Sequence, residues 1–316
     1  MPATRIYWLH ALSPTHAGIG RGVGYIDLPI DRDGVTGWPI IRGSTFKGVW
    51  ADYYTRKLVG SVERGKDPRK LDTPESRLLK IAFGIADGDD SNSGALIPTD
   101  AQLACLPARS FRGTFAWVTS PLCLQMLRRT LELAGVTALP AAPTELAQGE
   151  AHHAAKTSLA EGGQLFLEDL DFTARPCDTA NAWAGRIAQW AFPGEGTADE
   201  GWRGAFVKRF AVLPDSAFDF LCETGTEVHT RVRIDDDMKV VAKRALWTEE
   251  SLPAETILTG IVQCDRVFGR NGEDVTPTGL LDRFAQDPLT LQVGGKATVG
   301  RGQMRCVFTP VNGGGQ

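Results

Sequence analysis

The apolar residues of this chain recur at two spacings, which predict a mixture of strands and helices. Residues 5–12 (RIYWLHAL) are rich in aromatic and branched side chains and predict a first strand. Over residues 44–58, Phe46, Val49, Trp50 and Tyr53 follow the three- and four-residue spacing of a helix with one buried face. Similar patterns predict strands at 95–106, 227–234, 255–264, 289–293 and 303–309, and helices at 121–134, 179–192 and 276–285. Because no regular strand–helix–strand rhythm is sustained, the pattern favours an α+β fold.

Charged and glycine-rich segments interrupt these elements. Residues 60–94 read as a charged and acidic insertion, whose first part, 60–80, has two prolines and predicts a mobile surface segment. Its acidic part, ADGDDSNSG, lacks the spacing of an EF-hand and predicts a solvated loop. Residues 156–172 predict a hairpin that turns around Glu161-Gly162-Gly163.

Composition narrows the class of protein. The 316 residues are 42% hydrophobic and 23% charged, as in ordinary soluble globular proteins, and neither a membrane-spanning run nor a signal peptide is evident, so we expect a cytoplasmic protein. Six scattered cysteines without a C-x-x-C pair argue against a zinc finger or a disulfide framework. The net charge is −4, yet residues 1–80 carry 13 basic against 8 acidic residues. This asymmetry is compatible with nucleic-acid binding and does not establish it.

Two glycine loops at opposite ends of the chain suggest a site for a phosphate-bearing ligand. The first, within residues 13–48, has alternating glycines and leads into a helix start where Ser44 is the expected N-cap and Lys47 lies in the first turn. That lysine is unfavourable against the helix dipole unless an anion compensates it, although a solvated lysine is equally expected. Neither this loop nor the second, GGKATVGRG, has dinucleotide-binding or P-loop spacing. With Arg21, Lys296 and Arg301, the two loops could line one cleft for a nucleic-acid strand or a nucleotide.

The candidates for catalysis are few. His16 lies in the first glycine loop, where a functional role and a turn-stabilising role are both open. Asp27 follows the loop and could satisfy a turn, bind a metal ion or accept a proton from a ribose hydroxyl. The residues alone do not decide between these roles.

Four segments together resemble the repeating backbone subunit of type III-B CRISPR effectors, the fourth subunit of the Cmr complex, in the RAMP superfamily. They occur in the same order along nearly the whole chain: SPTHAGIG, IDLPIDRDGVTGWPIIRGSTFKG, TSPLCLQMLRRTLELAGV and LQVGGKATVGRG. The resemblance implies a single RAMP domain over residues 1–316, with an RRM-like (ferredoxin-like) core and a protruding thumb hairpin, expected at 150–175. It also implies CRISPR RNA (crRNA), target RNA, further copies of the chain in a filament and other Cmr subunits as partners.

The resemblance also implies roles for individual residues. Asp27 matches the catalytic aspartate of the family, and a divalent ion, Mg²⁺ or Mn²⁺, is expected there with bound RNA. Glu249 and Glu250 match a segment expected on the target side. The expected RNA-binding residues are His16, Arg21, Arg42, Ser44, Lys47, Gly294, Gly295, Lys296, Thr298, Gly300 and Arg301. The implied activity is cleavage of target RNA at regular intervals by attack of a ribose 2′-OH. A non-catalytic RNA-binding scaffold and a stand-alone RAMP endonuclease that matures CRISPR transcripts with His16 remain alternatives.

Overall fold

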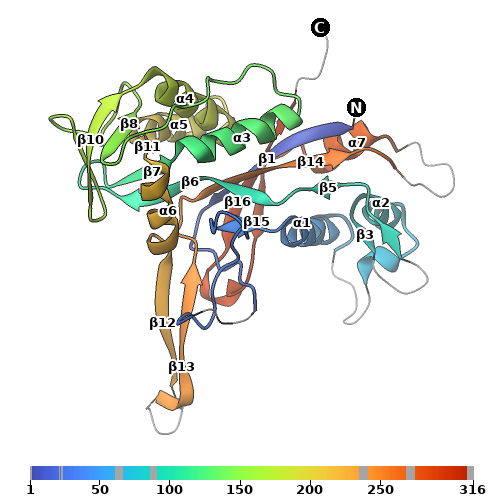
Figure 1. The fold of residues 1–316 in the computed structure, drawn as a ribbon. Coiled ribbons are helices and arrows are strands. Elements are labelled where there is room, and N and C mark those ends of the chain that lie inside the picture. Colours follow the sequence, from blue (N-terminus) through green and yellow to red (C-terminus); the bar gives the residue numbers. More distant parts are fainter. Residues whose placement is uncertain are drawn as a thin grey trace.

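A twelve-stranded sheet forms the body of the molecule, with helices on both faces (Figure 1). The computed structural model describes residues 2–20, 22, 24–60, 67–85, 91–234, 241–267 and 275–311. Its helices are α1 (Gly43–Leu58), α2 (Pro74–Phe83), α3 (Pro121–Leu133), α4 (Asp178–Ala191), α5 (Ala198–Arg209), α6 (Asp215–Thr224) and α7 (Pro277–Phe284). Its strands up to the middle of the chain are β1 (Ala3–Ala11), β2 (Ile40–Ile41), β3 (Gly84–Ile85), β4 (Asn92–Ser93), β5 (Ile97–Pro98), β6 (Ala101–Arg109), β7 (Phe115–Thr119) and β8 (Glu150–His153). The later strands are β9 (Gln164–Leu167), β10 (Leu170–Pro176), β11 (Phe210–Val212), β12 (Glu227–Ile234), β13 (Val241–Ser251), β14 (Ile257–Cys264), β15 (Leu289–Gln292) and β16 (Gln303–Pro310).

The core of the fold is ferredoxin-like, as the sequence predicts. The sheet order β16-β1-β14-β6 is antiparallel throughout, with α1 between β1 and β6 in the chain and α7 between β14 and β16. This is the β-α-β-β-α-β arrangement of the ferredoxin-like motif. The α1 stripe packs on one face, where Phe46 stacks on Tyr7 at a ring-centroid distance of 4.2 Å.

A second lobe continues the same sheet. Strands β7, β11, β8, β10 and β9 extend it beyond β6, and α3, α4 and α5 cover the face opposite α1. Strand β1 is buried on both sides, because Tyr7 and Leu9 face the α1 core while Ile6 and Trp8 face the second core. This explains why residues 5–12 lack a clean polar alternation.

Part of the predicted surface segment at 60–80 is a packed helix. Helix α2 buries Leu79, Ala82 and Phe83 in the same core as α1. Thr73 caps it by accepting a hydrogen bond from the Ser76 N–H at 3.1 Å, and Pro74 occupies the first helical position. The cap and the apolar stripe are local helix signals that outweigh the high charge of the segment. The predicted acidic loop falls mainly on residues 86–90, outside the described residues.

The hairpin expected as a thumb at 150–175 is placed differently in the structure. The predicted turn at 161–163 is present, since the backbones of Glu161 and Gln164 exchange two hydrogen bonds of 3.0 Å around Gly162 and Gly163. The paired strands, however, are β9 and β10, which are joined by a second turn at Glu168, with a positive φ of 50°. They continue the large sheet because Leu165, Leu167 and Phe172 are buried in the core. The hairpin that projects from the body is β12–β13 (Figure 1). Four of its larger apolar side chains, Val228, Val232, Ile234 and Leu246, are exposed, so they do not join a core that would hold the described part of the hairpin against the sheet.

The remaining expectations from composition can be compared with the described residues. All six cysteines are free and five are buried. Among the helices described, none has the length and apolar character needed to cross a membrane.

Candidate nucleic-acid interface

Three segments that are distant in sequence meet below the sheet: the first glycine loop, the base of β13 and the second glycine loop. The Thr15 N–H donates to the Leu252 carbonyl at 2.8 Å, which joins the first loop to the end of β13. The Gly295 N–H donates to the His16 carbonyl at 2.9 Å, which joins the two glycine loops. The sequence predicts that the two glycine loops line one cleft, and these contacts confirm that they lie side by side.

Close approach of the backbone requires glycine at position 294. Gly294 has a φ of +78°, and a Cβ built on it would lie 2.2 Å from the His16 carbonyl oxygen. Any other residue would therefore push the two loops apart.

His16 is a structural member of this junction. Its ring is buried, and Nδ1 lies 2.7 Å from the Glu250 carbonyl oxygen, so that nitrogen carries the proton. A Cβ added to Gly18 would lie 2.5 Å from Nε2, which places the other side of the ring against the loop backbone. Of the two roles left open by the sequence, this environment favours stabilisation of the loop.

Asp27 is exposed at the rim of the junction, and Thr248 of β13 holds it there. The Thr248 N–H donates to Asp27 Oδ2 at 2.8 Å, and the Asp27 N–H donates to Thr248 Oγ1 at 3.0 Å. The Leu28 N–H donates to the Thr248 carbonyl at 3.0 Å, so backbone pairing continues past the aspartate. An exposed carboxylate on a fixed backbone can accept a proton from a bound ligand.

The two glutamates of β13 are buried and paired. Glu249 Oε1 accepts from Lys296 Nζ at 2.8 Å and from Trp247 Nε1 at 2.7 Å. Burial acts to raise the pKa of Glu249, but the hydrogen bonds from Lys296 and Trp247 outweigh it and hold the pKa below its ordinary value. Glu250 accepts from Arg32 Nη2 at 2.6 Å and from the Ile30 N–H at 3.0 Å. Both carboxylates therefore tie loops to the base of the hairpin.

The basic residues of the second glycine loop share this arrangement. Lys296 has a φ of 65° and reaches Glu249, while Arg301 Nη1 lies 3.0 Å from Glu227 Oε2 at the start of β12. The loop is thereby clamped to both strands of the projecting hairpin. Thr298 and Gly300 lie on its exposed outer side.

The start of α1 differs from the predicted cap. The N-cap is Arg42 instead of Ser44, and it makes no side-chain cap hydrogen bond. Asp100 takes over that task by accepting from the Gly43 N–H at 2.7 Å, and Arg42 forms a double hydrogen bond with Asp31 at 2.7 and 2.9 Å. Ser44 is exposed in the first turn.

Lys47 stands one turn further along α1. It is half-buried, and burial lowers its pKa. Because α1 begins at Gly43, Lys47 is its fifth residue and lies beyond the first turn in which the sequence placed it.

An open cleft of about 260 Å³ lies between these parts. It is lined by His16, Ala17, Gly18, Gly20, Leu28, Asp31, Arg42, Thr45, Gly294 and Gly295. The cleft thus brings together His16, Arg42 and the two glycines predicted from the sequence, while Asp27 and Lys47 lie outside its lining. Arg21 falls outside the described residues.

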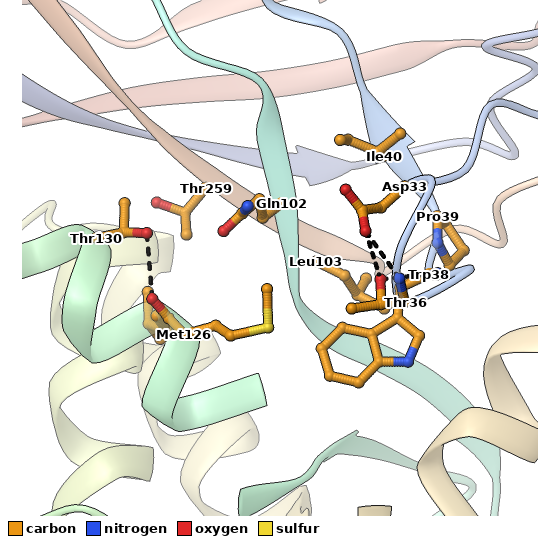
Figure 2. A pocket seen from close by; sticks show the side chains of 11 residues that line it. Asp33, Thr36, Trp38, Pro39, Ile40, Gln102, Leu103, Met126, Thr130 and Thr259 are labelled. Carbon is orange, nitrogen blue, oxygen red and sulfur yellow. Dashed lines mark hydrogen bonds between the residues drawn. The ribbon is translucent and has the colours of Figure 1, made fainter. Parts of the chain in front are cut away.

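Figure 2 shows a second, smaller pocket, where Trp38 and Ile40 approach Met126 and Thr130 of α3. Its volume of about 20 Å³ admits little more than one water molecule. Its carboxylate, Asp33, already accepts from the Thr36 N–H at 2.9 Å, and this bond lowers its pKa. The pocket is a turn packed on a helix and adds no candidate site.

The described residues do not build a metal site. They contain no cluster of three or more histidine, cysteine, aspartate or glutamate side chains that could hold an ion. Glu249 and Glu250 follow Thr248, the partner of Asp27, in β13. Their carboxylates already form ion pairs with Lys296 and Arg32, respectively. A divalent ion at Asp27 would need further ligands that the described side chains do not supply.

Comparison with known proteins places the chain in a family. The family model described as the RAMP superfamily matches residues 8–305. The chain belongs to the RAMP superfamily.

This RAMP protein is similar in sequence or in fold to several known proteins. It is 29% identical over 308 residues to the CRISPR system Cmr endoribonuclease Cmr4 of Pyrococcus furiosus, covering 97% of this chain and 96% of that protein. It superposes on the crystal structure of oligomeric Cmr4 from Pyrococcus furiosus with a TM-score of 0.70 at 25% identity, covering 98% and 99% of the two chains. The fold also matches a chain of the type III-B Cmr-beta complex bound to cognate target RNA, with a TM-score of 0.69, 19% identity and 96% of each chain covered.

Several residues that hold parts of the RAMP protein's candidate interface in place were not found by sequence reasoning. Thr248 holds Asp27. Asp100 caps the start of α1, and Arg32 pairs with Glu250. Thr248 stands directly before the two glutamates in LWTEES, which was the one local signal available. Asp100 and Arg32 carry no local signal, because their partners are distant in sequence.

Proposed function

We propose that this RAMP protein is the repeating backbone subunit of a type III-B CRISPR effector complex, that it binds crRNA, and that it cleaves complementary target RNA in the cytoplasm. The observation that carries the proposal is the exposed Asp27 carboxylate, held by β13 at the rim of a cleft formed by two glycine loops. Similarity to Pyrococcus furiosus Cmr4, an endoribonuclease, over nearly the whole of both chains supports it.

The guide strand is expected to follow the cleft and the start of α1. Backbone N–H groups of a helix start and glycines without side chains allow close approach of phosphates. Near the start of α1, Ser44 is exposed and Lys47 is half-buried. Gly18, Gly294 and Gly295 line the cleft. We propose that Lys47 pairs with a guide phosphate, and that Thr298, Gly300, Arg42, Lys296 and Arg301 contribute to the same path. Arg21, which lies outside the described residues, is proposed for this path from the sequence alone.

The target strand is expected on the side of Asp27 and the projecting hairpin. The 2′-oxygen attacks the adjacent phosphorus while the bond from phosphorus to the 5′-oxygen breaks. Asp27 accepts the 2′-OH proton, and the leaving 5′-oxygen takes a proton from water, so the products are a 2′,3′-cyclic phosphate and a 5′-OH. In-line attack requires an unstacked nucleotide. We propose that β12–β13, which projects where β9–β10 does not, acts as the thumb that imposes this distortion.

A divalent ion is proposed only for the complex with RNA. Since the described side chains offer no ligand cluster, the phosphates of the RNA would have to complete the coordination of Mg²⁺ or Mn²⁺. We therefore expect the isolated protein to bind neither ion in calorimetry.

We also propose that copies of the chain assemble side by side along the crRNA, together with other Cmr subunits. The superposition on an oligomeric Cmr4 over 98% of this chain supports assembly with further copies.

Substitution of Asp27 tests the catalytic part of the proposal. In a complex reconstituted with crRNA, Asp27→Ala should retain assembly and target binding and slow target cleavage by at least about 100-fold, the lower range for loss of a general base. Asp52→Asn, which changes an exposed carboxylate on α1, is the matched control and should cleave normally.

The alternatives predict different results in the same assay. A non-catalytic scaffold predicts that Asp27→Ala leaves any cleavage in the complex undiminished. A stand-alone processing nuclease predicts that the protein without partners cuts repeat RNA through His16. Burial of His16 and its hydrogen bond to Glu250 disfavour that reading.

A further inference from the structure

We infer that Thr248 is a positioning residue for Asp27 and that it couples the projecting hairpin to the cleavage step. This inference rests on the proposed function, since it assumes that Asp27 reacts with RNA. It concerns a residue whose own side chain need not touch the substrate.

Thr248 holds Asp27 with both its backbone and its side chain. The Thr248 N–H donates to Asp27 Oδ2 at 2.8 Å, and Oγ1 lies 3.1 Å from the same oxygen. In the other direction, Oγ1 accepts from the Asp27 N–H at 3.0 Å. Main chain and carboxylate of Asp27 are thus fixed by one residue.

The same hydroxyl also reaches the preceding turn. Oγ1 lies 3.0 Å from the Tyr25 carbonyl, so its single proton is shared between this oxygen and Asp27 Oδ2. Tyr25 and Asp27 are both exposed, and no core packing fixes their side chains. The orientation of this loop therefore depends on Thr248 more than on burial.

The contact has a direct consequence for reactivity. With Oδ2 held by Thr248, the carboxylate is presented in one orientation towards a ligand on the exposed side. A reacting group that loses its orientation reacts more slowly even when its chemistry is unchanged. Because Thr248 belongs to β13, displacement of the hairpin would also move Asp27.

A threonine of the second lobe provides a matched control. Thr173 of β10 is exposed on a strand that belongs to the large sheet and not to the projecting hairpin. Its side chain makes no hydrogen bond within the described residues. Thr173→Val therefore makes the same chemical change on a strand outside the cleft and the hairpin.

The test compares Thr248→Val, Thr248→Ser and Thr173→Val in the reconstituted complex with crRNA, under single-turnover conditions with the complex in excess over target RNA and above the dissociation constant. Thr248→Val should slow cleavage about 10- to 100-fold, as expected for a misplaced reacting group. Thr248→Ser keeps the hydroxyl and should restore the rate to within about threefold, and Thr173→Val should match the wild type. Target affinity should stay within about twofold in all three.

Two results would overturn the inference. One is a Thr248→Val complex that cleaves at the wild-type rate while Asp27→Ala is inactive, which would leave the proposed function intact. The other is equal loss in Thr248→Val and Thr248→Ser, which would make the role of Thr248 merely structural. If Thr248→Val fails to assemble, Thr248→Ala carries the same expectation. Cleavage by Asp27→Ala would instead overturn the proposed function.

Discussion

At the scale of single residues, the junction between the glycine loops and the hairpin contains two buried carboxylates, Glu249 and Glu250, each paired with a basic side chain. Glu249 is 5% exposed and lies between Lys296, Trp247 and Arg231. Removal of one partner from such a group leaves the others desolvated and unpaired, which costs more than the pair itself contributes. Charged residues at this site therefore stabilise the junction whether or not they also meet RNA.

Glu249→Gln should destabilise the protein by about 1–3 kcal/mol at pH 7, because Lys296 and Arg231 lose their counter-charge. The folded-state pKa of Glu249 is lowered, so its contribution is present above the ordinary glutamate pKa of about 4.3 and is lost as the pH falls through the folded value. Denaturant unfolding from pH 7 to pH 3 should show the wild type and the variant converging at acid pH. Glu132→Gln, in an exposed pair with Arg128, should change stability by less than about 0.5 kcal/mol.

At the scale of elements, the second glycine loop is held as a clamp between β15 and β16. Its ends bond to the first loop, through Gly295 to His16 and through the Gly302 N–H to the Pro14 carbonyl at 2.9 Å. Its basic residues bond to both strands of the hairpin. The loop therefore fixes the base of β12–β13 relative to the ferredoxin-like core.

Gly294→Ala should weaken this clamp. Its positive φ costs about 1–2 kcal/mol for any other residue, and the contact with the His16 carbonyl adds to that cost. Gly300→Ala is the control, since Gly300 has a φ of +77° but open space around it. Thermal unfolding should show a larger decrease in Tm for Gly294→Ala than for Gly300→Ala. Equal decreases would mean that backbone strain alone, and not the loop contact, determines the effect.

At the scale of the whole molecule, the two lobes share one sheet, and a side-chain ion pair also joins them. Asp199, in the first turn of α5, accepts two hydrogen bonds from Arg305 of β16, at 2.9 and 2.7 Å, and one from the Gly194 N–H at 2.9 Å. The pair is largely buried and links the helical cover of the second core to the central sheet.

Asp199→Asn should destabilise the protein by about 1–3 kcal/mol, as expected for hydrogen bonds to a charged group. Burial acts to raise the pKa of Asp199, but Arg305 and the Gly194 N–H lower it overall. Its contribution is therefore present above the ordinary aspartate pKa of about 3.9 and is lost at lower pH. Unfolding curves should therefore show the wild type to be more stable than Asp199→Asn at pH 7, and this difference should be smaller at pH 3. Asp282→Asn, which removes the exposed partner of Arg5, should have little effect at either pH.

The sequence by itself determined the class of fold and many of its elements, although helices α5 and α6 were not predicted. The predicted stripe of Phe46, Val49, Trp50 and Tyr53 and the alternating strands are local patterns, and the structure confirms α1, β12 and β14 close to their predicted bounds. Within α1, Phe46 and Trp50 are buried, whereas Val49 and Tyr53 are only partly buried. The α+β class and the ferredoxin-like core are confirmed as well. Residues 74–83 were missed, because charged neighbours obscured a short apolar stripe behind a good cap.

Only the tertiary structure decided how the site is assembled. Thr248 and Asp27 are 221 positions apart, and Glu250 and His16 are 234 apart, so no local pattern could pair them. The strand register of β13 against the first loop places them together. The two hairpins at 164–176 and 227–251 have similar alternating patterns. The first forms an edge of the large sheet because its apolar side chains are buried in the core, and the second projects from the body because its larger apolar side chains are exposed. Long-range burial and register, which depend on the whole chain, make that difference.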